Sequence, residues 1–183
     1  MPNPISTIGS MILLVFVMFY ITTFESYQKQ ENLLYDNTYK AVTEFVDNVR
    51  FKGYITPEMY EDFEDKIDVS DTLFDIEIVH KHKVYNPIYT DPTNLNSFTG
   101  DYTVDYDEYY SGDIEDKLFN DTSVAYADRM YKMEKDDYFQ IYIENKTRLK
   151  SKIIFDSLTG GKFDDDAVGI SIPYGGMIHN EDY

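Results

Sequence analysis

The sequence contains no cysteine and no tryptophan, and only 3 of its 183 residues are histidine. Without cysteine the chain forms no disulfide, thiolate metal site, cysteine nucleophile or cysteine-linked lipid anchor. Basic residues are also scarce, because 16 lysines and arginines stand against 34 acidic residues and leave a net charge of −18. A phosphate-binding surface needs clustered Lys and Arg, so we expect no nucleic-acid partner.

The acidity does not predict disorder. Hydrophobic residues make up 43% of the chain, with 18 tyrosines and 12 phenylalanines, which is too much apolar surface for a chain that stays unfolded. The length suits one domain with an additional anchor or stem. We therefore expect a folded acidic head attached to one further element.

That further element is an uncharged run from Ile5 to Phe24, assigned here to residues 1–24. As a helix it would be roughly 30 Å long, the thickness of the hydrocarbon core of a bilayer. A secretory signal peptide would have basic residues before the run and a small-x-small cleavage site after it, and the sequence shows neither. The pattern favours retention as a membrane or stem helix over cleavage.

The helix is predicted to continue through residues 25–52, where neither proline nor glycine interrupts it. Apolar residues recur at spacings of seven, four and four, which gives one apolar stripe on a charged helix. We expect one helix of about 45 residues that is apolar all round in its first half. Its stripe should pack against the head through Leu34, Ala41, Phe45 and Val49.

The head, residues 53–183, is predicted to be α+β. Gly53 ends the long helix, and Thr56 with Pro57 starts a second one. Alternating apolar residues indicate half-buried strands, which is typical of an antiparallel sheet with one face on the core. The expected inward residues are Met59, Tyr60, Phe63 and Ile67 of the helix, and Phe74, Ile76, Ile78, Phe139, Ile141, Ile143, Val168, Ile170 and Ile172 of the strands.

Other parts of the head carry weaker patterns. A short helix closed by Gly160 is expected to turn Leu149, Ile153, Ile154 and Leu158 inward. The stretch "DYTVDYDEYY" is a weaker strand with Val104 and Tyr106 facing in. Residues 86–100 and 120–136 are predicted to be long loops, because they are rich in Pro, Asn and Asp.

The chain resembles the pilins and pseudopilins in having a long apolar N-terminal helix that runs into a small α+β head. More specifically, "EFVDNVRFKGYITPEMYEDF", "HKHKVYNPIYTDPT", "SLTGG" and "IPYGGMIHNEDY" are similar to single-span proteins of clostridial-type bacteria associated with Tad-like or type IV pilus machinery. The resemblance covers residues 44 to 183 and implies a structural role without catalytic residues. Two features of type IV prepilins are not matched: a short basic leader is not seen before the apolar run, and the first acidic residue, Glu25, follows the run instead of lying near its start.

Two main functional hypotheses follow, and a third, a membrane-anchored hydrolase, is weaker because nothing singles out one carboxylate pair among 34 acidic residues. The first is a structural subunit of an extracellular filament, which is membrane-inserted before assembly and then contacts copies of itself and the pilus or secretion machinery. The second is a solitary membrane-anchored binding module that does not polymerise. In the first, the residues expected to mediate assembly are Ile5, Ile8, Gly9, Ile12, Leu13, Phe16, Val17, Phe19 and Tyr20.

The head is expected on the outer surface of a bacterial cell. Lys29 and Lys40 follow the apolar run, so the positive-inside rule mildly favours an internal head. Long segments translocate largely regardless of such charges. An acidic, tyrosine-rich, cysteine-free head suits the extracellular side.

No cofactor, metal site or catalytic residue is predicted. His80 and His82 lie on one face of a strand and could bind a transition metal only with a third ligand, from His179 or a carboxylate. We expect instead two histidines at the strand end where the buried face meets solvent. The acids of "KFDDDAV" and "DYTVDYDEYY" could hold a structural calcium ion, but neither fits the twelve-residue calcium loop.

Overall fold

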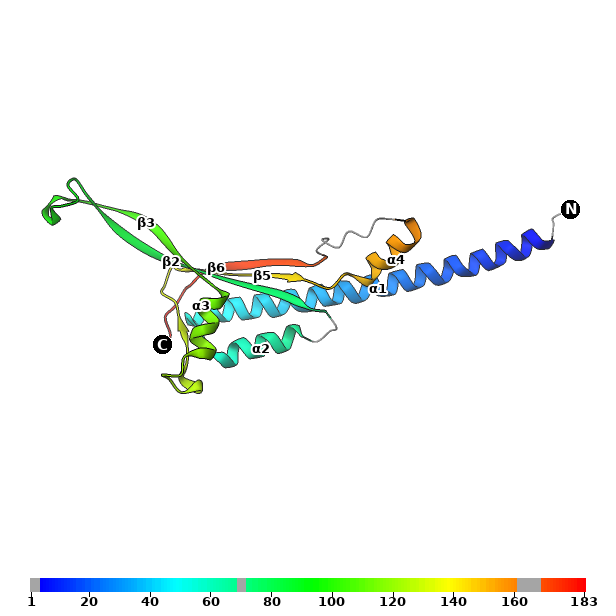
Figure 1. Cartoon of the computed structure of the whole chain (residues 1–183), viewed down its shortest axis with the longest axis horizontal. Helices are drawn as coiled ribbons and strands as arrows, with labels where there is room; N and C mark the ends of the chain where they lie inside the picture. The colour runs from blue at the N-terminus through cyan, green and yellow to red at the C-terminus, as the bar shows by residue number, and fades with distance from the viewer. Residues whose placement is uncertain (1–3, 69–71, 161–168) are drawn as a thin grey trace.

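The computed structural model describes residues 4–68, 72–160 and 169–183. Figure 1 shows an elongated molecule in which the N-terminal half of a long helix projects from one end of the head, and a two-stranded arm projects from the other. The predicted α+β class is confirmed: a long N-terminal helix packs on a small antiparallel sheet.

The long helix, α1, runs unbroken from Pro4 to Lys52. It ends at Gly53, whose φ of 79° lies in the left-handed region that glycine adopts most readily. The Gly53 N–H donates to the carbonyl of Val49 at 2.8 Å, so the predicted helix end is confirmed. Close packing also requires glycine here, because a Cβ atom would lie 2.2 Å from the Asn180 carbonyl oxygen.

The second helix, α2 (Pro57–Ile67), begins where the sequence predicted. The Thr56 side chain caps it by accepting from the Met59 N–H at 3.2 Å, and Pro57 occupies the first turn. Tyr60, Phe63 and Ile67 are buried and Met59 is partly buried. The predicted apolar face of this helix is therefore confirmed.

The main sheet has the strand order β3-β2-β5-β6, and all its pairs are antiparallel. Its strands are β2 (Phe74–Tyr89), β3 (Phe98–Tyr110), β5 (Tyr138–Asn145) and β6 (Ser171–Met177). A separate two-stranded sheet pairs β1 (Tyr54–Ile55) with β4 (Tyr131–Lys132). Short helical segments complete the described chain: η1 (Leu95–Ser97), α3 (Ser111–Glu115), η2 (Asp116–Asn120), η3 (Tyr126–Asp128) and α4 (Lys150–Thr159).

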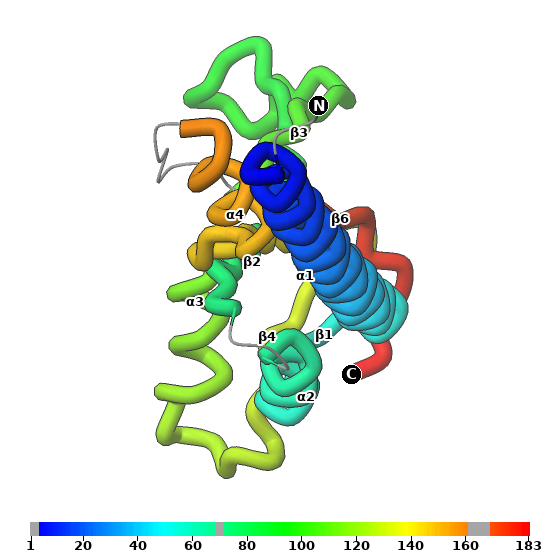
Figure 2. Tube along the Cα trace, turned by 90° about the vertical axis from the view of Figure 1, so that its right-hand side faces the viewer, coloured from blue at the N-terminus to red at the C-terminus, as the bar shows by residue number. Residues whose placement is uncertain are grey.

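The core lies between α1, α2 and the inward face of the sheet. In Figure 1, α4 lies above α1 and α2 lies below it, and Figure 2 looks along the molecule with α2 again below α1. Phe45 of α1 stacks on Phe63 of α2, with ring centroids 4.5 Å apart, and meets Phe139 of β5 at 6.4 Å. The opposite face of the sheet carries exposed side chains such as Glu77 and Tyr142, as expected for an antiparallel sheet with one solvated face.

The predicted loop over residues 86–100 is too long at both ends. Strand β2 continues to Tyr89 and β3 begins at Phe98, so only residues 90–97 form the loop, at the tip of a long hairpin. Pro87 is tolerated because β2 pairs with β5 only as far as Lys81 and beyond it has β3 as its single partner. The pairing has an irregularity between Pro87 and Tyr89.

The predicted strand "DYTVDYDEYY" is present as part of β3, but its predicted orientation is wrong. Val104 and Tyr106 are 43% and 49% exposed, and every residue of β3 is exposed. The cause is that the outer part of the hairpin extends past the helices (Figure 1), so no part of the described chain covers either of its faces. The alternation of apolar and polar residues in this strand therefore does not mark a buried face.

Two further predictions need correction. The predicted apolar face of α4 is wrong for Ile153 and Leu158, which are exposed. Leu149, which precedes the helix, is partly buried, and the buried residue of the helix itself is Ser151. The predicted loop 120–136 contains β4 and η3. Ile170 and Ile172 face the core as predicted, while Val168 and "KFDDDAV" lie outside the described residues.

Replacing Gly53 with Ala should destabilise the protein. The left-handed conformation alone costs a residue with a Cβ about 1–2 kcal/mol, and the contact with Asn180 adds to it. We expect the thermal midpoint of the detergent-solubilised chain to fall by about 2–4 °C per kcal/mol. Gly112→Ala is the control, because a Cβ there has no neighbour within 4 Å. Equal midpoints for the two variants would contradict this account of the helix end.

Candidate functional site

The first candidate site is the apolar half of α1, which the head leaves uncovered. Its most apolar 18-residue stretch has a mean hydropathy of 2.2 and is 0% buried. By length and composition this helix is long and apolar enough to serve as a membrane anchor or a signal sequence. Of the residues predicted to mediate assembly, Tyr20 is half-buried and the following are exposed: Ile5, Ile8, Gly9, Ile12, Leu13, Phe16, Val17 and Phe19.

The residues predicted to join stem and head lie farther along the same helix. Ala41, Phe45 and Val49 are buried, and Leu34 is partly buried against the core. Thr38, Val42 and Val46 are buried as well. The boundary between the two halves therefore lies near Leu34, and about three turns of partly polar helix separate it from Phe24.

Helix α4 bridges that interval. Glu31 of α1 accepts from the Ser151 backbone N–H at 2.9 Å and from the Ser151 hydroxyl. One turn farther along α4, Phe155 approaches Phe24 with ring centroids 6.3 Å apart. These contacts attach the head to the stem close to the end of the apolar run.

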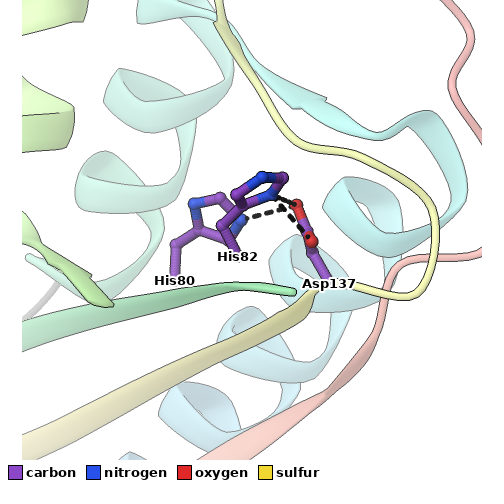
Figure 3. Close-up of side chains that lie close together, drawn as sticks. All are labelled: His80, His82 and Asp137. Carbon is purple, nitrogen blue, oxygen red and sulfur yellow. Dashed lines mark hydrogen bonds and ion pairs between the residues drawn. The ribbon is translucent and has the colours of Figure 1, made fainter. Parts of the chain in front are cut away.

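The second candidate site is a cluster of His80, His82 and Asp137 (Figure 3). His80 and His82 project from the same face of β2, and Asp137 directly precedes β5. His80 Nε2 lies 2.9 Å from Asp137 Oδ2, and His82 Nδ1 lies 3.1 Å from both carboxylate oxygens. The cluster thus joins β2 to the turn before β5.

Backbone groups fix the Asp137 carboxylate independently of the histidines. The Lys83 N–H donates to Oδ1 at 2.9 Å, and the Glu134 N–H donates to Oδ2 at 2.8 Å. Asp137 is also 1% exposed. Burial raises the pKa of this carboxyl, but the hydrogen bonds from Lys83, His80, His82 and Glu134 outweigh it and hold the pKa below its ordinary value.

His80 is the most enclosed histidine of the cluster, at 3% exposure. Its Nδ1 lies 2.7 Å from the Tyr131 hydroxyl, and its ring stacks on Tyr109 with centroids 5.6 Å apart. Burial lowers the pKa of His80, against the opposing effect of Asp137. The neutral ring therefore donates from Nε2 to Asp137 and accepts at Nδ1 from Tyr131.

The expectation that both histidines lie where the buried face meets solvent is wrong for His80. It fits His82 better, because the side chain of His82 is 29% exposed. His179 lies elsewhere, with Nε2 3.0 Å from Arg50 Nη2 and its ring beside Phe51. The sequence offered His179 or a carboxylate as a third ligand. The structure places the carboxylate of Asp137 beside the two histidines, and His179 is not part of the cluster.

Asp137 could be predicted as the third member of the cluster only from the register of β2 and β5. Residue pairs of β2 and β5 run from Phe74 with Asn145 to Lys81 with Tyr138. One further step of the same antiparallel register places Asp137 opposite His82. Since the sequence has 34 acidic residues, nothing marked this one before the strands were aligned.

No protein-family model, curated protein or solved structure matches the chain. The resemblance to pilin-like proteins accordingly stays a prediction. The two candidate sites rest on the geometry described above.

The buried neutral state of His80 predicts a pH-dependent stability. Because its folded pKa is lowered from 6.5, its contribution is fully present above that value and is lost as the pH falls through the lower folded pKa. His80→Gln should therefore lower the thermal midpoint near pH 7.5, and the difference from wild type should shrink by about pH 5. Thermal melts at both pH values measure this. A gap that widens at low pH would show that His80 is charged in the folded protein.

Proposed function

We propose that the chain is a pilin-like structural subunit of an extracellular filament, assembled through the apolar half of α1 and displaying the acidic head. The observation that carries the proposal is the continuity of α1 from an uncovered apolar half into the core of the head. Contiguous apolar surface of this size needs a cover of lipid or protein. Before assembly the cover would be the membrane, and in the filament it would be copies of the same helix.

The rigid connection favours a filament subunit over a simple anchor. An anchor has to cross the bilayer, and a flexible linker to the head serves that purpose equally well. Here no proline or glycine interrupts residues 25–52, and α4 is attached to the stem at Glu31 and Phe24. A fixed angle between stem and head is what a regular assembly with many identical contacts requires.

The proposed partners are copies of the chain, the pilus or secretion machinery, and the membrane before assembly. The proposed location is the bacterial cell surface. A net charge of −18, carried beyond residue 24, would place acidic heads at the outside of such a filament. The role proposed is structural and not enzymatic.

A second candidate function is a solitary membrane-anchored module that binds a partner without polymerising. The observation that favours it is the projecting hairpin β2–β3, which exposes several aromatic rings: Tyr85, Phe98, Tyr102, Tyr106 and Tyr110. Exposed tyrosine supplies large contact area at low entropic cost. Shearing intact cells and imaging the released fibres, with mass spectrometry for this chain, separates the two candidates.

A fragment from Ser26 to Tyr183 should be soluble, folded and monomeric. The stripe of α1 is covered by the chain's own sheet and α2, while the uncovered apolar run is removed. Sharp near-ultraviolet circular dichroism and a monomer mass by light scattering at micromolar concentration are expected. A fragment that remains oligomeric would place the assembly surface in the head.

Gly9→Leu tests whether the apolar half of α1 packs against neighbouring helices. Gly9 lies with Ser6 and Ser10 in a patch of small residues, where helices can approach closely. Within the chain a Cβ at Gly9 meets nothing within 4 Å, so the substitution disturbs no contact of the subunit itself. We expect the variant to insert in the membrane with its head exposed but to yield few sheared filaments.

Gly9→Ala is the matched control, because it keeps the small surface and should assemble as the wild type does. Membrane fractionation and surface proteolysis check insertion, and electron microscopy of sheared material checks assembly. Filaments of normal abundance from the Gly9→Leu variant would rule out close helix packing at this patch. A wild type that yields no filaments would favour the anchored-module candidate.

A further inference from the structure

We propose that His80, His82 and Asp137 bind one divalent transition-metal ion, for which Zn²⁺ is the best match. One nitrogen of each histidine and one carboxylate oxygen lie within 4.8 Å of one another. The three side chains converge in Figure 3 from β2 and from the residue before β5. This site is independent of the proposed filament, since it lies in the head and involves no residue of α1.

The separations are close to those of a coordination sphere. Zinc binds imidazole nitrogen and carboxylate oxygen at about 2.0–2.2 Å, which puts neighbouring ligand atoms of a tetrahedral ion about 3.3–3.6 Å apart. The Asp137 carboxylate lies 2.9 Å from His80 Nε2 and 3.1 Å from His82 Nδ1, a little less than that range, and the ligand atoms of all three residues lie within 4.8 Å of one another. The adjustment on metal binding would fall mainly on His82, because its side chain is partly exposed.

The surroundings hold the ligands in position before a metal arrives. Backbone N–H groups of Lys83 and Glu134 orient the Asp137 carboxylate. The Tyr131 hydroxyl lies 2.7 Å from His80 Nδ1. When Nε2 binds the metal, the ring proton lies on Nδ1 instead of Nε2, and the hydroxyl oxygen can accept a hydrogen bond from it. A hydrogen bond to the second nitrogen is the usual support of a metal-binding histidine, and it fixes both tautomer and ring orientation.

The donor set selects among cations. Two imidazoles and one carboxylate suit Zn²⁺ and its transition-metal neighbours, whereas Ca²⁺ and Mg²⁺ require mostly oxygen ligands. Three protein ligands leave one tetrahedral position, which water can reach from the exposed side of His82. The ion would take the place of the hydrogen bonds between the two rings and the carboxylate.

The position of the site indicates what the ion would do. His80 pairs with Tyr109 of β3 on one side and Phe139 of β5 on the other, at the point where the hairpin leaves the sheet. The Asp137 carbonyl also accepts from the Ile178 N–H at 2.8 Å in the C-terminal segment. A bound ion would join the hairpin base to the turn before β5 and stabilise the head against unfolding.

The test is a zinc titration of the full chain in detergent. The protein is stripped with a chelator and titrated by calorimetry in excess Ca²⁺, which occupies the exposed acidic residues. We expect one zinc ion per chain and a higher thermal midpoint with zinc. His82→Gln should weaken binding at least about tenfold and abolish that stabilisation. The absence of stoichiometric zinc binding by the wild type would overturn the proposal without any variant.

His179→Gln is the matched control, because it removes a histidine that lies beside Arg50 and outside the cluster. It should bind zinc as the wild type does. Circular dichroism checks that both variants are folded. Loss of binding in His179→Gln, or undiminished binding in His82→Gln, would assign the zinc to another surface and overturn the proposal.

Discussion

The packing of the amphipathic half of α1 against the sheet and α2 is the contact on which the rest of the structure depends. Phe45 lies between Phe63 and Phe139, and Val42, Val46 and Val49 are fully enclosed beside it. Burying such a side chain contributes about 1.5–3 kcal/mol, so this stripe holds the head to the helix. Since the same helix continues into the apolar half, whatever holds that half also fixes the head in orientation.

The elements that rest on local patterns were predictable from the sequence. A stripe at helical spacing, the caps at Gly53 and Thr56, and period-two alternation in β2 and β5 each gave the right element. These signals are short-range, because each is read within one or two turns or along one strand. Nothing outside the element was needed to place them.

The errors arose where exposure depends on distant parts of the chain. Val104 and Tyr106 alternate as a buried strand would, yet every residue of β3 is exposed, because the hairpin projects past the helices that the structure describes. Pro87 indicated a loop, and it lies instead on an edge with a single partner strand. For the same reason Asp137 was not predicted as a partner of the histidines. Its position beside them follows from the register of β2 on β5 and not from the residues next to it in the sequence.

The register also explains why the cluster lies where it does. A two-stranded ribbon has little stability of its own, so the hairpin needs its base to be held. Pairing of β2 with β5 stops at Lys81. Beyond it, the backbone N–H of Lys83 donates to the Asp137 carboxylate, which takes the place of a strand carbonyl as the acceptor. Asp137 thereby completes the ladder, and its charge requires the donors that His80 and His82 provide. The histidines are thus part of the contact that ties the base of the projecting hairpin to the sheet, which itself packs on α1.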